Sequence, residues 1–276
     1  MKQALWQGKV LPLIMGIMNL SPDSFYTGSC QTAVDHLLST AENMIRSGCD
    51  IIDIGAESTR PGAQVVSPDL ELERLIPALC ALRSHFPNIP ISVDTTKAQV
   101  AIACLEQGVE IINDVSGLNW GTGMIHALLK YQPYYVLMHI QGVPATMQEN
   151  PQYDDVVAEI CSFWNERTRW LIDQGFPEEL IIVDPGIGFG KSVEHNLRIM
   201  RHLQCLRNVG FPLLIGLSRK SFLGKLLNLP DPQDRLHATI VMHTLSIQQG
   251  VDILRVHDVL PAVQARTLIR ELELII

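Results

Sequence analysis

The stretch LEQGVEIIND, residues 105–114, has the form of a helix end followed directly by a buried strand. The same order recurs in IRSGCDIID at 45–53 and QQGVDILRV at 248–256. In each segment a glycine is followed by one further residue, an acidic residue and an apolar run. Glycine suits the left-handed conformation that ends many helices, because it has no Cβ to clash there. A looser fourth copy is DQGFPEELIIVD at 173–184. Alternating helices and strands with short links predict parallel strands joined by right-handed crossovers.

Eight short apolar runs are predicted to be the strands of one α/β fold. Eight such units in 276 residues match a single (β/α)8 TIM barrel, so 1–276 is predicted to be one domain. Helix starts are predicted at Thr32, at Ser67 and at Asp231. A doubly wound open sheet has the same alternation, and periodicity does not exclude it. The predicted strands are 13–19, 51–57, 91–95, 111–115, 134–140, 181–185, 212–218 and 253–259.

Composition and charge indicate an enzyme-sized globular protein. The chain is 47% hydrophobic and 18% charged, with a net charge of −8, so no broad basic field exists to hold nucleic acid or an anionic membrane. No apolar run approaches the roughly 20 residues that a membrane helix needs. The six cysteines have no metal-ligand spacing and are expected to be reduced and mostly buried. We therefore expect a cytoplasmic protein whose partners are small molecules.

Nearly every predicted strand finishes with a polar residue. In a barrel these ends converge on one mouth, which is where active sites of this fold lie. A single polar strand end is usually a cap for the next helix, whereas so many together favour a site. The residues are Asn19, Glu57, Asp94, Asn113, Asp114, His139, Asp184, Ser218, Arg255 and His257.

The last strand carries two cationic side chains on one face. Side chains alternate along a strand, so Arg255 and His257 point the same way while Asp258 points the other. Two neighbouring cations predict a bound anion, and the position beside strands seven and eight favours phosphate. The alternative is a structural salt bridge from Arg255 to an aspartate on another strand, because a buried arginine is rarely without a partner.

The acidic strand ends predict a different kind of ligand contact. Asp94 and Asp184, in a largely apolar mouth, require hydrogen-bond donors, and with Asn113 they suit a heterocycle edge bearing N–H and NH2 groups. Lys220 can then meet an acceptor such as a ring carbonyl. A structural lysine–aspartate pair is the alternative. Asn19 can offer an oxygen to Mg²⁺, or is an ordinary turn residue.

The run DPGIGFGKS at 184–192 imitates nucleotide-binding motifs without matching them. It lacks the last glycine of the dinucleotide fingerprint, and Pro185 stands where a P-loop needs its first glycine. These glycines are predicted to form a flat loop close to a ligand. His139 ends a strand but has no role that the sequence indicates.

In chain order, eight motifs of this sequence resemble those of the dihydropteroate synthase family, the folate-pathway enzymes inhibited by sulfonamides. The resemblance runs through nearly the whole chain and implies a transferase that joins (7,8-dihydropterin-6-yl)methyl diphosphate to 4-aminobenzoate. The motifs are MGIMNLSPDSF (15–25), DIGAESTRPG (53–62), SVDTTK (92–97), INDVSG (112–117), LMHIQGVPATMQ (137–148), DPGIGFGK (184–191), GLSRKSF (216–222) and RVHDV (255–259).

The resemblance also implies roles for particular residues and a homodimer. Asn19 would bind Mg²⁺, while Arg255, His257 and Lys220 would be the catalytic group. The residues implied in the pterin site are Asp94, Asn113, Val115, Met138, Asp184 and Lys220. Those implied around the diphosphate are Thr59, Arg60, Arg255 and His257, and those framing the aminobenzoate are Phe25, Pro61, Phe189 and Ser218.

One departure from the family pattern lies in the first loop. The family typically continues Ser-Phe-Ser-Asp-Gly-Gly, whereas Phe25 is followed here by Tyr26, Thr27 and Gly28, so the acidic residue is missing at Thr27. This keeps open a catalytically silent pterin-binding barrel. A pterin-dependent methyltransferase of the same barrel type is the other alternative, although it has no need for Arg255, His257 and Lys220 around a diphosphate.

Overall fold

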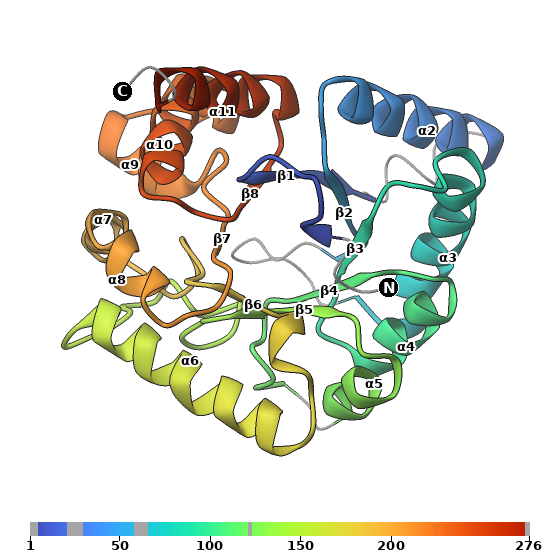
Figure 1. The fold of residues 1–276 in the computed structure, drawn as a ribbon, viewed down its shortest axis with the longest axis horizontal. Helices are drawn as coiled ribbons and strands as arrows, with labels where there is room; N and C mark the ends of the chain where they lie inside the picture. Colours follow the sequence, from blue (N-terminus) through green and yellow to red (C-terminus); the bar gives the residue numbers. More distant parts are fainter. Residues whose placement is uncertain (1–4, 21–29, 58–65, 121–122, 274–276) are drawn as a thin grey trace.

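The fold is a barrel of parallel strands surrounded by helices, as a computed structural model shows (Figure 1). The structure describes residues 5–20, 30–57, 66–120 and 123–273. The strands lie in the order β6-β5-β4-β3-β2-β1-β8-β7, and a parallel bridge between Val183 and Leu213 joins the two outer strands. The sheet is therefore nearly closed, which confirms the predicted TIM barrel and excludes the open doubly wound sheet.

All eight predicted strands are present, although most are shorter than predicted. Their apolar side chains are almost completely buried, which explains the continuous hydrophobic runs in the sequence. The strands are β1 (Leu13–Asn19), β2 (Ile51–Gly55), β3 (Ile91–Asp94), β4 (Ile111–Asp114), β5 (Tyr134–Met138), β6 (Ile181–Asp184), β7 (Leu214–Ile215) and β8 (Ile253–Val256).

Helices follow the strands and cover the outside of the barrel (Figure 1). Ser67 accepts a hydrogen bond from the Leu70 amide and caps its helix, as predicted, and Asp231 caps a 3-10 turn in the same way. The start predicted at Thr32 is wrong, since that helix already begins at Cys30. The helices are α2 (Cys30–Arg46), α3 (Pro68–His85), α4 (Ala98–Glu106), α5 (Met124–Tyr131), α6 (Val156–Asp173), α7 (Val193–Arg201), α8 (Leu203–Arg207), α9 (Ser221–Leu227), α10 (Leu236–Gln248) and α11 (Val259–Glu273).

The acidic residue of the sequence repeat has a structural task. Asp50 accepts a hydrogen bond from the Ile14 amide at 3.0 Å, Glu110 from Ile91 at 2.9 Å and Asp252 from Leu213 at 2.8 Å. Each carboxylate, just before its own strand, therefore holds the first residues of the preceding strand. Without these acceptors, amides at the bottom of the barrel would need water or another partner.

The repeat glycines and the cysteines complete the comparison with sequence. Gly48, Gly108 and Gly250 all have positive φ, of 94°, 82° and 76°, as predicted for helix ends. Five cysteines have defined side-chain burial in the described chain, and all five are free, as predicted. Of these only Cys49 and Cys104 are buried, so the prediction that most cysteines are buried is wrong for them. Within the described segments, none of the helices has the length and apolar character needed to cross a membrane.

Candidate active site

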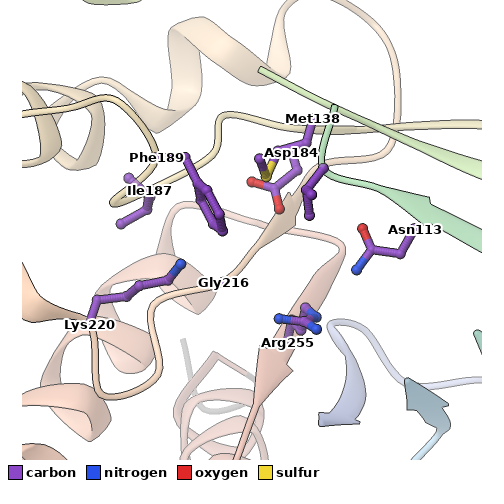
Figure 2. A pocket seen from close by; sticks show the side chains of 9 residues that line it. Asn113, Met138, Asp184, Ile187, Phe189, Gly216, Lys220 and Arg255 are labelled. Atoms are coloured by element: carbon purple, nitrogen blue, oxygen red, sulfur yellow. The ribbon is translucent and has the colours of Figure 1, made fainter. Parts of the chain in front are cut away.

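The polar strand ends meet in a pocket at one mouth of the barrel. Figure 2 shows Lys220 and Phe189 on one side of it and Asn113 on the other, with Arg255 between them in the lower part of the view. Part of the lining is apolar: Val115, Met138 and Phe189 belong to a small hydrophobic cluster separate from the main core. The lining residues are Asn113, Val115, Met138, Asp184, Ile187, Phe189, Gly216, Lys220 and Arg255. Strands distant in sequence thus bring most of the predicted pterin site together.

Arg255 lies between two carboxylates from neighbouring strands. Its Nε donates to Asp53 Oδ2 at 2.6 Å, and its Nη2 donates to Asp94 Oδ2 at 2.8 Å. Asn113 Nδ2 also approaches Asp53 Oδ2, at 3.3 Å. The salt-bridge alternative for Arg255 is therefore present, although two of its five guanidinium N–H groups suffice for these bonds and Arg255 still lines the pocket.

Sequence reasoning missed Asp53, which is fully buried at the centre of this network. Asp53 is the third residue of β2, and the alternation of the strand directs its side chain into the barrel. A charged residue inside an otherwise apolar strand was the available signal, because lone buried carboxylates are rare.

The two predicted pterin carboxylates are buried near cations. Burial raises the pKa of Asp94, and the adjacent Arg255 guanidinium opposes that rise. Burial likewise raises the pKa of Asp184, while a hydrogen bond of 2.7 Å from the Gly186 amide and the charge of Lys220 oppose it. A ligand that donates hydrogen bonds would favour the ionised form of both groups.

Lys220 reaches the pocket from the loop after β7. Within the described chain it forms no ion pair with a carboxylate, so the lysine–aspartate alternative is absent there. Its Nζ lies 4.1 Å from the centre of the Phe189 ring, in cation–π contact. Burial lowers the pKa of Lys220 to about 8, against the attraction of Asp184.

Ser218 and His257 lie beside the pocket and are not part of its lining. The Ser218 hydroxyl accepts a hydrogen bond of 3.1 Å from the main-chain amide of His257, which ties the ends of β7 and β8 together. Between Ser218 and Lys220, Arg219 donates to both carboxylate oxygens of Asp258, at 2.8 and 2.7 Å. Asp258 thus has its own partner away from Arg255, as the strand alternation predicts.

A second buried cation, Lys191, was also missed. Its ammonium lies 3.0 Å from His139 Nδ1, 3.3 Å from the His139 carbonyl oxygen and 3.0 Å from the Phe189 carbonyl oxygen. Burial lowers the pKa of Lys191, and burial lowers the pKa of His139 to about 2, so the imidazole is neutral. No motif in the sequence connects His139 with the end of a glycine loop.

The remaining predicted positions concern the metal and the motifs that contain Phe25 and Thr59. Asn19 is exposed at the end of β1. In the part of the chain that the structure covers, no group of three or more acidic, histidine or cysteine side chains could hold a metal ion. Four predicted residues lie outside the described residues, as does Thr27: Phe25, Thr59, Arg60 and Pro61.

This arrangement suits a flat polar molecule held by its edge. Buried carboxylate and amide groups can accept or donate along one edge, apolar side chains can cover both faces, and Lys220 and Arg255 supply positive charge. The predicted site therefore has the chemistry of a binding and charge-stabilising pocket.

Comparison with known proteins agrees with this chemistry. Residues 15–257 match the model of the pterin binding enzyme family. The chain is 44% identical to the dihydropteroate synthase of Synechocystis sp., an alignment that covers 89% of this chain and 85% of the relative.

Solved structures show the same likeness. The Yersinia pestis dihydropteroate synthase with a sulfonamide drug complex has a TM-score of 0.87 at 39% identity, covering 95% of this chain and 94% of the other. The Xanthomonas albilineans dihydropteroate synthase in complex with 7,8-dihydropteroate has a TM-score of 0.84 at 35% identity, with the same two coverages. The chain therefore belongs to the dihydropteroate synthase family, the pterin-binding transferases of folate biosynthesis.

Proposed function

We propose that this protein condenses (7,8-dihydropterin-6-yl)methyl diphosphate with 4-aminobenzoate to give 7,8-dihydropteroate and diphosphate. The carrying observation is the pocket itself, in which Asp184, Asn113 and Lys220 surround an apolar slot at the mouth of the barrel. A related enzyme is in complex with 7,8-dihydropteroate, the product of this condensation. Residues 1–276 act in this proposal as one domain.

The pterin is held by its polar edge. Asp184 accepts hydrogen bonds from the ring N–H and NH2 groups, Asn113 and Asp94 complete the edge, and Lys220 donates to a ring acceptor. Val115 and Met138 cover the ring faces. A buried carboxylate without a donor from the ligand is costly, so these groups discriminate strongly against rings that lack the matching donors.

The reaction is a dissociative substitution. The C–O bond to diphosphate breaks first and leaves a cationic pterin methylene; the aniline nitrogen then forms the C–N bond and loses a proton. Asp94 and Asp184 stabilise the cation, while Arg255, His257 and Lys220 stabilise the departing charge. No side-chain nucleophile is needed for these steps.

Arg255 can serve this role while bound to protein. The bonds to Asp53 and Asp94 fix the plane of the guanidinium, and its other N–H groups remain to meet phosphate oxygens. The two carboxylates thus act as supports that orient the cation before the substrate arrives.

Mg²⁺ fits this site as an ion bound jointly with the diphosphate. Asn19 offers one neutral amide oxygen at the exposed end of β1, and the described residues contain no acidic cluster that would hold the ion alone. Mg²⁺ commonly keeps several waters and combines few protein ligands with substrate phosphates. When bound, it would neutralise charge on the leaving group.

The aminobenzoate lies towards the Phe189 side of the pocket. The Phe189 ring offers an apolar face, and Ser218 offers a hydroxyl close to the same mouth. We also assign Thr59 and Arg60 to the diphosphate, and Phe25 and Pro61 to the aminobenzoate, from the family motifs that contain them.

We propose a homodimer formed through α10 and α11. Helix α10 buries Thr239, His243 and Ser246 but exposes Val241 at 58%, which is the reverse of an ordinary surface helix. On α11, Leu268 is 65% exposed. A second copy covering these side chains would remove them from water.

Leu268→Glu should then convert a dimer into a monomer, as measured by the molar mass from light scattering. An unchanged mass would contradict this interface.

Small-molecule substrates are the partners in this proposal, with neither nucleic acid nor membrane, and the cytoplasm is the proposed location. The net charge of −8 supports the exclusion of nucleic acid.

The test is an assay of the purified protein with both substrates, with Mg²⁺ and with excess chelator, following dihydropteroate. Product that requires Mg²⁺ is expected. Pterin binding by calorimetry without any product would favour the silent barrel, and methyl transfer from methyltetrahydrofolate to a corrinoid would favour the methyltransferase.

A further inference from the structure

Lys191 is a buried cation that the proposed reaction does not use. Its side chain ends among two main-chain carbonyl oxygens and Nδ1 of a neutral imidazole. Within the described chain no carboxylate lies within ion-pair distance of it. An ammonium has three N–H donors, enough for all three contacts. A buried amino group held only by neutral groups is costly to ionise, and burial lowers the pKa of Lys191 to about 7.

The acceptors belong to two segments that line the pocket. His139 directly follows Met138, the last residue of β5, while Phe189 lies in the glycine loop after β6. The two segments touch main chain to main chain: a Cβ added at Gly186 would lie 2.0 Å from the His139 carbonyl oxygen, and one at Gly190 would lie 2.3 Å from that of Gln141. Lys191 therefore donates hydrogen bonds to both segments where their main chains are in direct contact. Any side chain at Gly186 or Gly190 would prevent that contact.

Other parts of the loop are held by neutral side chains. Asn196 accepts from the Gly188 amide at 2.8 Å, and the Tyr153 hydroxyl donates to the Gly190 carbonyl at 2.9 Å. Between these two anchored glycines, the Phe189 carbonyl receives its donor from Lys191. The ring on the same residue projects into the pocket, where Lys220 lies against it (Figure 2).

We propose that Lys191 is a positioning residue: by holding the Phe189 carbonyl against the end of β5, its ammonium sets the place of the Phe189 ring in the pocket. Lys220 is then placed indirectly, through its contact with that ring. The inference deepens the proposed function, in which Phe189 frames the aminobenzoate, and therefore rests on it. Lys191 itself touches neither substrate.

The test compares Lys191→Met, which removes the ammonium and keeps the chain length, with Lys225→Met on the exposed surface of α9. We expect the kcat/KM for 4-aminobenzoate to fall about tenfold or more in Lys191→Met, because small displacements of a positioning group are costly in rate. The KM for the pterin diphosphate should change much less. Lys225→Met should match the parent protein.

A second measurement needs no substrate. In protein labelled with 4-fluorophenylalanine, Phe189 is one of seven fluorinated rings, and Phe189→Leu assigns its resonance. The Phe189 resonance should move or broaden in Lys191→Met and stay in place in Lys225→Met. If the parent protein makes no dihydropteroate, the proposed function fails, while this resonance still decides whether Lys191 positions the ring.

An unmoved Phe189 resonance, or equal losses for both substrates, would overturn the inference. Should Lys191→Met fail to fold, as circular dichroism would reveal, Lys191→Gln keeps two donors without the charge. It should show the same selective loss for 4-aminobenzoate on a smaller scale together with a shifted resonance, and an equal loss for both substrates would again overturn the assignment.

Discussion

Two arginine–aspartate groups at the ends of β7 and β8 look similar and are built differently. In the outer group, Arg219 donates to both oxygens of Asp258, one cation to one anion, with side chains 25% and 22% exposed. In the inner group, Arg255 faces two carboxylates, those of Asp53 and Asp94, with the arginine 18% exposed and Asp53 fully buried.

This difference suggests a structural role for the outer group and a ligand-binding role for the inner group. The outer pair is balanced in charge and uses both carboxylate oxygens, so it has little left to offer a ligand. In the inner group two carboxylates share one guanidinium, and Asp53 Oδ1 is buried without a hydrogen bond in the described structure. Buried groups that are only partly satisfied are costly for folding, and they are common where function needs them.

The strongest test of the difference between the two groups is Arg255→Ala, which removes the cation of the inner group. We expect kcat to fall by at least about 10²-fold, because charge stabilisation at the leaving group is lost. Folding should suffer too, by about 3 kcal/mol, since two buried carboxylates lose their partner. The double variant Arg255→Met with Asp53→Asn should regain most of the stability in urea unfolding and none of the turnover. Recovery of turnover in that variant would mean that Arg255 has a structural role alone.

The next effect concerns Asp184. Asp184→Asn keeps an oxygen for the Gly186 amide and so should fold normally, but we expect about 10²-fold weaker calorimetric binding of a pterin, because the donor NH2 group opposes ring donors. Asp155→Asn is the matched control, since Asp155 is only partly buried, does not line the pocket, and asparagine caps a helix equally well. Equal affinity in the parent and Asp184→Asn would refute the pterin contact.

A smaller effect is expected from pH. Burial lowers the pKa of Lys220 to about 8, so the ammonium loses its proton as pH rises through that value, well before an ordinary lysine. If the cation is the active form, kcat/KM should fall about fivefold between pH 8 and 9. Lys220→Arg, which does not titrate there, should lose this alkaline decline, whereas Lys225→Arg should keep it. A decline retained in Lys220→Arg belongs to another group.

The smallest effect should come from breaking the outer ion pair between Arg219 and Asp258. Asp258→Asn removes a partly exposed ion pair, and we expect a loss of about 1 kcal/mol in the free energy of unfolding. Steady-state constants for both substrates should change by less than about threefold, since solvent screens the pair. A larger loss of turnover than Arg255→Ala produces would reverse the roles assigned to the two groups.

The barrel was predictable because its signals are local. Apolar runs, left-handed glycines such as Gly108, and the cap at Ser67 act within a few residues and survive in the structure. The helix start at Thr32 was misplaced, because several nearby residues can begin the same helix.

The site was predictable in part for the same reason. Alternation along β8 places Arg255 and Asp258 on opposite faces, and polar strand ends do converge. Which partner each group chooses depends on contacts between residues far apart in sequence, such as Arg255 with Asp53. Lys191 was overlooked because it contacts the main-chain oxygens of Phe189 and of the distant His139, and main-chain atoms leave no trace in residue type.

The joint between β6 and β7 has a further consequence. Strand β7 has two residues, and a single bridge from Val183 to Leu213 links it to β6. Amide exchange by local opening should therefore begin at this joint, where the fewest main-chain bonds must break. Asp184 ends β6 and Lys220 follows β7, so a pterin bound to both, as proposed, would connect the two sides of the joint and hold the barrel closed. Ligand protection against exchange should be greatest along this line.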